Sequence, residues 1–164
     1  MDLRDTPDEA QFRTELGAWF EANLPESLRG HRGGEARYSD DAIRDWSRML
    51  YEAGYVGLTW PKDYGGGGKP YSYQAIFLEE IARAEAPQHL GVIGLGMAGP
   101  TIIALGTEAQ KARYLQPLLS ADEIWCQGFS EPEAGSDLSA VRTSARLSEI
   151  GVRNRSPIRI NEQK

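Results

Sequence analysis

The sequence predicts a mainly α fold, in which a helical domain over residues 1–122 is followed by the first strand or strands of an incomplete β domain. Two segments, 6–9 and 107–110, have the spacing of helix capping boxes. Apolar residues recur at helical spacing between these two segments. Strand-like character is confined to residues 124–129, just before a stretch rich in turn residues.

The first helix is predicted to begin at Pro7, because Thr6 can cap it and Glu9 can complete a capping box. Asn23 and Pro25 are expected to end it. Its apolar face consists of Phe12, Leu16, Trp19 and Phe20.

A second helix is predicted after Ser39, with Gly54 as its C-terminal stop. Its buried stripe consists of Ile43, Trp46 and Leu50. Residues 57–68 contain Pro61 and four successive glycines, so they are expected to form a loop.

A third helix is predicted over residues 72–86, with Ile76, Phe77, Ile81 and Ala84 facing inward. Residues 90–105 are apolar on nearly every side, which predicts a buried helix with a break near Gly99-Pro100. The next helix opens at Thr107, and its inner face includes Tyr114, Leu118 and Leu119.

Composition excludes several classes of protein. The 164 residues include one cysteine and two histidines, so we expect no disulfide framework and no metal site. No run of eighteen apolar residues occurs and the N-terminus is acidic, so we expect no membrane span and a cytoplasmic location. A net charge of −6 argues against nucleic acid as a partner.

Two glycine-rich motifs are weak evidence for nucleotide binding. Gly94, Gly96 and Gly99 fit the pattern G-x-G-x-x-G, but the strand and long helix that this dinucleotide fingerprint requires do not surround them. Small residues that allow close helix packing are the simpler interpretation. The run at 65–68 lacks the Lys-Ser/Thr ending of a phosphate loop and is interpreted as a flexible surface loop.

Residues 125–138 are the most informative stretch. Ser130 ends the predicted strand, and a turn of small residues follows that could present backbone N–H groups and two serine hydroxyls to a flat polar ligand. An ordinary turn, in which Asp137 satisfies nearby backbone groups, is equally compatible with these residues. Cys126 has no histidine partner and is expected to be a small buried residue of the strand.

Residues 129–138 resemble the signature of the flavin-dependent acyl-CoA dehydrogenases, which reads small/apolar–Ser/Thr–Glu–Pro–x–Ala–Gly–Ser–Asp. Residues 57–66 and 99–115 also resemble segments of that family, in the same order and spacing. The resemblance implies the family's N-terminal helical bundle, followed by a β domain and a C-terminal four-helix bundle. It also implies FAD as the cofactor and α,β-dehydrogenation of an acyl-CoA, in fatty-acid or related acyl catabolism.

The resemblance further implies that one segment lies against the flavin, namely Gln127, Gly128, Phe129 and Ser130. It places Gly135 and Ser136 where the cofactor phosphates and the CoA arm meet, with Ser136 contacting the thioester substrate. Glu131 and Asp137 are expected to hold the turn. The glutamate base of the family belongs to a C-terminal region that this sequence lacks, so we assign no catalytic residue.

The resemblance makes residues 123–145 the start of the middle β domain, and it leaves 146–164 as an atypical basic tail for which disorder is one alternative. Residues 142–164 carry six Lys or Arg against two Glu. Implied partners are an acyl-CoA substrate, an electron-transfer flavoprotein as acceptor, and dehydrogenase subunits in a homo- or hetero-oligomer. Two alternatives to an active dehydrogenase stay open: a truncated inactive fragment, and a non-catalytic partner subunit of a full-length enzyme.

Overall fold

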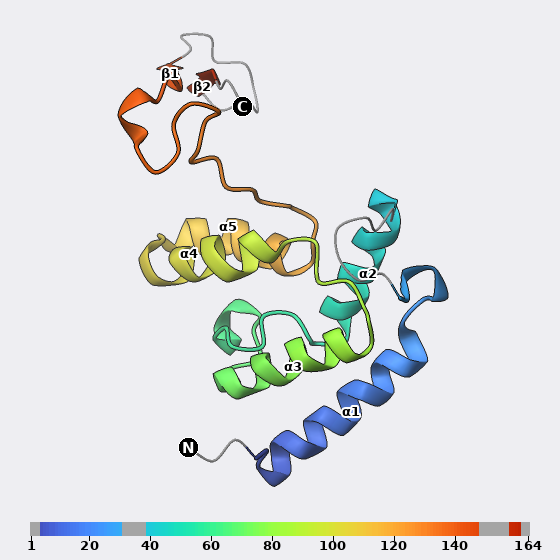
Figure 1. Cartoon of the computed structure of the whole chain (residues 1–164). Coiled ribbons are helices and arrows are strands. Elements are labelled where there is room, and N and C mark those ends of the chain that lie inside the picture. Colours follow the sequence, from blue (N-terminus) through green and yellow to red (C-terminus); the bar gives the residue numbers. More distant parts are fainter. Residues whose placement is uncertain (1–3, 31–38, 148–157, 162–164) are drawn as a thin grey trace. The chain divides into compact units, whose positions relative to one another are not determined.

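The structure is a computed structural model, and it describes residues 4–30, 39–147 and 158–161 (Figure 1). The chain forms two compact units, residues 1–126 and residues 127–164. The described part of the first unit is helical, as predicted. None of the helices in the described residues is long and apolar enough to cross a membrane.

Helix α1 runs from Pro7 to Asn23 and begins with the predicted capping box. The backbone N–H of Thr6 donates to the Glu9 carboxylate at 2.8 Å, and the Thr6 hydroxyl accepts from the backbone of Glu9. Leu16 and Phe20 are buried on its inner face. A short 3₁₀ turn, η1 (Glu26–Leu28), follows.

Helix α2 spans Asp40–Glu52, and the Ser39 hydroxyl accepts from the backbone N–H of Ala42 as its cap. Trp46 and Leu50 are buried, whereas Ile43 is half-buried. Gly54 ends the helix at φ +78°, a left-handed conformation that glycine adopts without strain. The predicted loop contains one 3₁₀ turn, η2 (Lys62–Tyr64).

Helix α3 (Tyr71–Arg83) ends three residues before the predicted Ala86, where Glu85 takes a positive φ of 50°. It packs along α1, as Figure 1 shows. Arg13 of α1 donates to the Glu80 carboxylate of α3 at 2.8 Å, and Arg83 donates to the same oxygen at 2.8 Å.

The prediction of a helix over residues 90–105 is confirmed for most of this range, but the prediction that it is buried is wrong in part. The chain forms a π-helical turn, η3 (Gly94–Ala98), that continues into helix α4 (Gly99–Leu105). Leu95, Ile102 and Ile103 are half-buried against the core, whereas other apolar side chains of this segment are exposed. Val92 is 45%, Met97 50% and Leu105 83% exposed. A helix that is apolar all round needs neighbours on every side, and the described residues cover only part of this one.

The predicted break near Gly99-Pro100 is also absent. The N–H of Gly99 donates to the carbonyl of Gly94, a π-type bond, and Pro100 then stands in the first turn of α4. Proline is tolerated in the first turn of a helix because its missing N–H would have no helical partner there.

Helix α5 (Glu108–Leu119) opens with the predicted second capping box, formed by Thr107 and Gln110. Leu118 and Leu119 are buried, and Tyr114 is half-buried. Helices α1, α2, α3 and α5 contribute buried residues to the apolar core of this unit, and α4 packs against that core through the half-buried Ile102 and Ile103. The buried core includes Leu16, Phe20, Leu28, Trp46, Leu50, Trp60, Phe77, Ile81, Leu115, Leu118 and Leu119.

The strand predicted at residues 124–129 is wrong. These residues have no ladder partner within the described part of the chain, and a strand exists only through such pairing. Cys126 is therefore exposed rather than buried. Beyond it lie a 3₁₀ turn, η4 (Leu138–Ala140), and a strand β1 (Ser144–Leu147) that pairs antiparallel with β2 (Ile158–Asn161).

Strand β2 lies in the basic tail and pairs with β1, with Ser144 opposite Asn161. Residues 148–157 and 162–164 of that tail lie outside the described residues.

Candidate functional site

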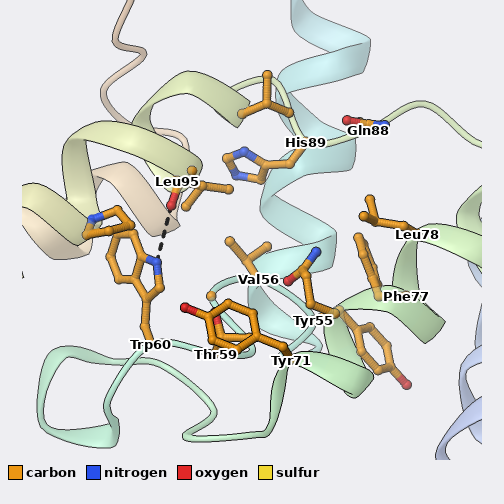
Figure 2. A pocket seen from close by; sticks show the side chains of 15 residues that line it. Tyr55, Val56, Thr59, Trp60, Tyr71, Phe77, Leu78, Gln88, His89 and Leu95 are labelled. Carbon is orange, nitrogen blue, oxygen red and sulfur yellow. Dashed lines mark hydrogen bonds between the residues drawn. The ribbon is translucent and has the colours of Figure 1, made fainter. Parts of the chain in front are cut away.

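A cavity of about 460 Å³ lies within the helical unit (Figure 2). Its volume falls within the range of small-molecule sites, roughly 300–1,000 Å³. Among the described residues that line it there is no Asp, Glu, Lys or Arg. The apolar part of the lining consists of Tyr55, Val56, Trp60, Tyr71, Phe77, Leu78, Val92, Leu95 and Pro100.

Three segments of the chain form the walls of this cavity: the loop at 55–60, helix α3, and residues 88–100. The indole N–H of Trp60 donates to the carbonyl of Leu95 at 3.2 Å, drawn as the dashed line in Figure 2. A Cβ built on Gly99 would lie 2.1 Å from the Trp60 ring. The missing side chain at Gly99 therefore lets the loop and the helix close on each other.

The glycines of the G-x-G-x-x-G pattern do serve close packing at two positions. Gly94 packs on Leu118 and Gly99 on Trp60, and a Cβ at either would collide with its neighbour. Gly96 differs, because a Cβ there would meet nothing within 4 Å, and Gly96 lines the cavity. Sequence reasoning had no means to separate Gly96 from the other two.

His89 is buried at the cavity wall, 6% exposed, and both ring nitrogens have partners (Figure 2). The backbone N–H of Gly91 donates to Nδ1 at 2.9 Å, so the ring proton is on Nε2, which lies 3.2 Å from the carbonyl of Leu119. Burial lowers the pKa of His89 below its ordinary value, which keeps the ring neutral. A lone histidine in the sequence gave no signal of this role.

Polar groups in the cavity are few and uncharged. Thr59, Gln74 and Gln88 line it, and their side chains make no hydrogen bond with the described residues. Apolar walls with a small number of available polar groups are typical of a site for an apolar ligand that carries one or two oxygens. Trp60 is both buried and part of this wall.

The residues predicted to contact flavin all lie in the second unit, described here by itself. All of them are exposed, namely Gln127, Gly128, Phe129, Ser130, Gly135 and Ser136, with Phe129 at 71%. The backbone groups of 127–130 make no hydrogen bond with the described residues. Their N–H, carbonyl and hydroxyl groups are therefore available to a ligand.

Glu131 and Asp137 hold the turn, as predicted. The N–H groups of Glu131 and Ala134 each donate to the other's carbonyl, at 2.9 and 3.1 Å. The Glu131 carboxylate accepts from the backbone N–H groups of Arg142 and Thr143, at 2.8 and 2.7 Å. Asp137 accepts from the N–H of Ser139 at 2.9 Å, which lowers the pKa of its carboxyl. Both carboxylates are thus occupied by structural hydrogen bonds.

The donor set of 127–136 fits part of a flavin site. Peptide groups and serine hydroxyls supply the neutral donors and acceptors that the polar edge of an isoalloxazine ring needs, and Phe129 supplies an apolar surface. Around Gly135 a Cβ would meet nothing within 4 Å, so the backbone there is open to close approach.

Comparison with known proteins identifies the family. The profile described as "Acyl-CoA dehydrogenase, N-terminal domain" matches residues 6–122. Acyl-CoA dehydrogenase IpdE1 of Mycobacterium tuberculosis is 40% identical over 144 residues, which cover 85% of this chain and 37% of that protein.

Solved structures support the same family assignment. The ChsE4-ChsE5 complex from Mycobacterium tuberculosis matches with a TM-score of 0.72 and 35% identity, over 88% of this chain and 36% of that one. An acyl-CoA dehydrogenase complexed with FAD from Bacillus anthracis matches with a TM-score of 0.66 and 25% identity, over 88% of this chain and 25% of that one. The chain thus spans little more than a third of IpdE1 and of the matched ChsE4-ChsE5 chain, and a quarter of the Bacillus anthracis chain. It belongs to the acyl-CoA dehydrogenase family.

Proposed function

We propose that this chain is part of an FAD-dependent acyl-CoA dehydrogenase, which introduces a double bond between the α and β carbons of an acyl-CoA in fatty-acid or related acyl catabolism. The uncharged apolar cavity in the helical unit carries the proposal. An acyl group is an apolar chain that ends in a thioester carbonyl, and burying it in such a cavity removes its surface from water.

Residues 123–145 are proposed as the start of the middle β domain, with Gln127, Gly128, Phe129, Ser130, Gly135 and Ser136 contacting FAD. Ser136 is proposed to contact the thioester as well. FAD, when bound, would supply the acceptor for the hydride that leaves the β carbon. The base that removes the α proton has no candidate in this chain, and an electron-transfer flavoprotein is the proposed electron acceptor.

FAD uptake tests the cofactor part of this proposal. Added FAD should stay with the full chain through desalting and give a flavin absorption spectrum that differs from that of free FAD. Phe129→Asp should lose this binding, because it places a charge in the proposed apolar contact. Ser139→Ala, in the same unit but outside the proposed contacts, should keep it. A chain that retains no FAD would contradict the proposal and favour the inactive-fragment alternative.

A second candidate is a subunit that works only with another dehydrogenase chain. One of the similar solved structures is described as a complex of ChsE4 and ChsE5. In this chain Met97 and Leu105 are exposed apolar residues that a partner could cover. Co-expression with a full-length family member, followed by size-exclusion chromatography, should give one shared peak. Separate elution of the two chains would contradict this candidate.

A further inference from the structure

The glycine motif at 94–99 contains one residue whose missing side chain no packing contact explains. A Cβ on Gly94 would lie 2.6 Å from Leu118, and one on Gly99 would lie 2.1 Å from Trp60. Both contacts are far too short, so glycine is required at these positions for packing. At Gly96 a Cβ would have nothing within 4 Å. Protein packing therefore does not require glycine there.

Gly96 belongs to the wall of the cavity. Val92, Gly96 and Pro100 all line it, and their four-residue spacing places them on one face of the helical segment. Gly96 is also the middle residue of the π-helical turn η3, a type of turn that is often found at functional sites. Gly96 is thus an exposed lining residue with open space where a side chain would stand, so a larger residue there would add bulk at the cavity wall.

The other walls of the cavity carry aromatic side chains. Tyr55, Trp60, Tyr71 and Phe77 present aromatic rings from the loop and from α3. Trp60 is fixed, because its indole N–H is bonded to Leu95 and its ring lies against Gly99. These aromatic rings and the helical segment that bears Gly96 line the same cavity, and residue 96 adds no side chain to it.

We infer that Gly96 determines acyl-group specificity, because its missing side chain leaves room for a branched or ring-bearing acyl end that a larger residue would exclude. The inference rests on the proposed function, in which the cavity receives the acyl group. A straight chain needs less width, so its binding depends less on residue 96. The shape of the acyl group would thus decide which acyl-CoA binds, since the described residues that line the cavity include no charged side chain.

The test uses the full chain and two thioesters with the same number of carbon atoms, octanoyl-CoA and cyclohexylacetyl-CoA, titrated in a calorimeter. The unchanged chain should bind cyclohexylacetyl-CoA at least as tightly as octanoyl-CoA. Gly96→Val should weaken cyclohexylacetyl-CoA binding by about tenfold or more and octanoyl-CoA binding by less than about threefold, in line with the effect of a few methyl groups in an apolar pocket. Gly96→Ala should weaken cyclohexylacetyl-CoA binding by less than Gly96→Val does.

Ala104→Val is the matched control, because Ala104 is exposed on α4 and does not line the cavity. It should leave both affinities unchanged. Equal weakening of both thioesters by Gly96→Val, or no effect on either, would overturn the specificity role while leaving the proposed function intact. Failure of the unchanged chain to bind either thioester would overturn the proposed function and this inference with it.

Discussion

At the scale of single residues, His89 joins the cavity wall to the end of α5. Its ring accepts from Gly91 and lies within hydrogen-bonding distance of the Leu119 carbonyl, and it is buried. A proton on Nδ1 would face the Gly91 N–H, so the charged ring would lose that hydrogen bond and repel its donor. The folded state thus binds this proton more weakly than the unfolded state does.

This arrangement predicts a pH dependence of stability. The folded pKa of His89 lies below its unfolded value of about 6.5, so the free energy of unfolding should fall as the pH drops through about 6.5. Carboxyl groups with lowered pKa values, such as those of Asp122 and Asp137, lose their contribution only at lower pH. Urea unfolding at pH 7.5 and 5.5 measures the change.

His89→Gln supplies the control for this prediction, because it removes the titrating ring. The variant should be less stable at pH 7.5 by about 1–3 kcal/mol, since a buried hydrogen-bonding arrangement is lost, but its stability should change less between the two pH values. The same pH slope in both proteins would contradict a role for His89.

Alanine substitutions at Gly99 and Gly96 form a matched pair, because their effects on the stability of the fold should differ. Gly99→Ala should destabilise the fold by about 1–3 kcal/mol, because the new methyl group would overlap the Trp60 ring. Gly96→Ala should cost nothing or stabilise by up to about 1 kcal/mol, because it has open space and alanine favours helix. Chemical unfolding measures both, and equal effects would contradict the packing described for Gly99.

At the scale of elements, a charged network ties α1 to α3. Arg13 donates to Asp5, Glu79 and Glu80, and these bonds raise the pKa of Arg13. The side chain of Glu80 is only 9% exposed, so its carboxylate depends on such partners. The network therefore links the two helices through side-chain hydrogen bonds.

Loss of Arg13 should therefore weaken the α1–α3 pairing. Arg13→Gln should lower the free energy of unfolding by about 1–3 kcal/mol, because Glu80 would keep only the more exposed Arg83 as a charged partner. Arg48→Gln is the control, since its pair with Asp122 is half-exposed and solvent screening should make its loss smaller than that of Arg13. Urea unfolding measures the free energy of unfolding of both variants. Equal decreases in the two variants would contradict the dependence of the buried Glu80 carboxylate on Arg13.

Local signals predicted the helices well. Thr6, Ser39 and Thr107 each cap a helix as the sequence indicated, because a cap depends only on residues within one turn. Elements that depend on distant partners were predicted poorly. Residues 124–129 have the composition of a strand but no partner, and residues 90–105 are apolar on faces that the described chain does not cover.

The candidate site shows the same difference between features that depend on local sequence and features that depend on distant segments. The segment from Gln127 to Ser136 was found from its motif, and its flavin contacts stay a prediction. The cavity was not foreseen, because its walls come from three separate segments whose meeting depends on the tertiary fold. Trp60 lies in a segment that resembled the family, which was the one available signal, whereas His89 and Gly96 gave none.

At the scale of the whole molecule, apolar side chains remain exposed in both units. Met97 and Leu105 are 50% and 83% exposed in the first, and Phe129 is 71% exposed in the second. Relatives in the family are nearly three times as long as the matched part of this chain. Exposed apolar surface of this kind favours association with other polypeptides.

The isolated chain should therefore self-associate as its concentration rises. Sedimentation velocity over a range of concentrations should show an increasing mass, and a Met97→Glu, Leu105→Glu double variant should shift the association to higher concentration. A chain that stays monomeric throughout, with no difference between the two proteins, would contradict this expectation.

Binding of an acyl group in the helical unit is the central claim, and calorimetric titration of the full chain with octanoyl-CoA and with free CoA tests it most directly. Octanoyl-CoA should bind more tightly than CoA, and Val92→Asp should abolish that difference because it places a charge in the cavity wall. Leu105→Asp, exposed and outside the lining, should preserve it. Equal affinity for octanoyl-CoA and CoA, or an acyl preference that survives Val92→Asp, would contradict the account.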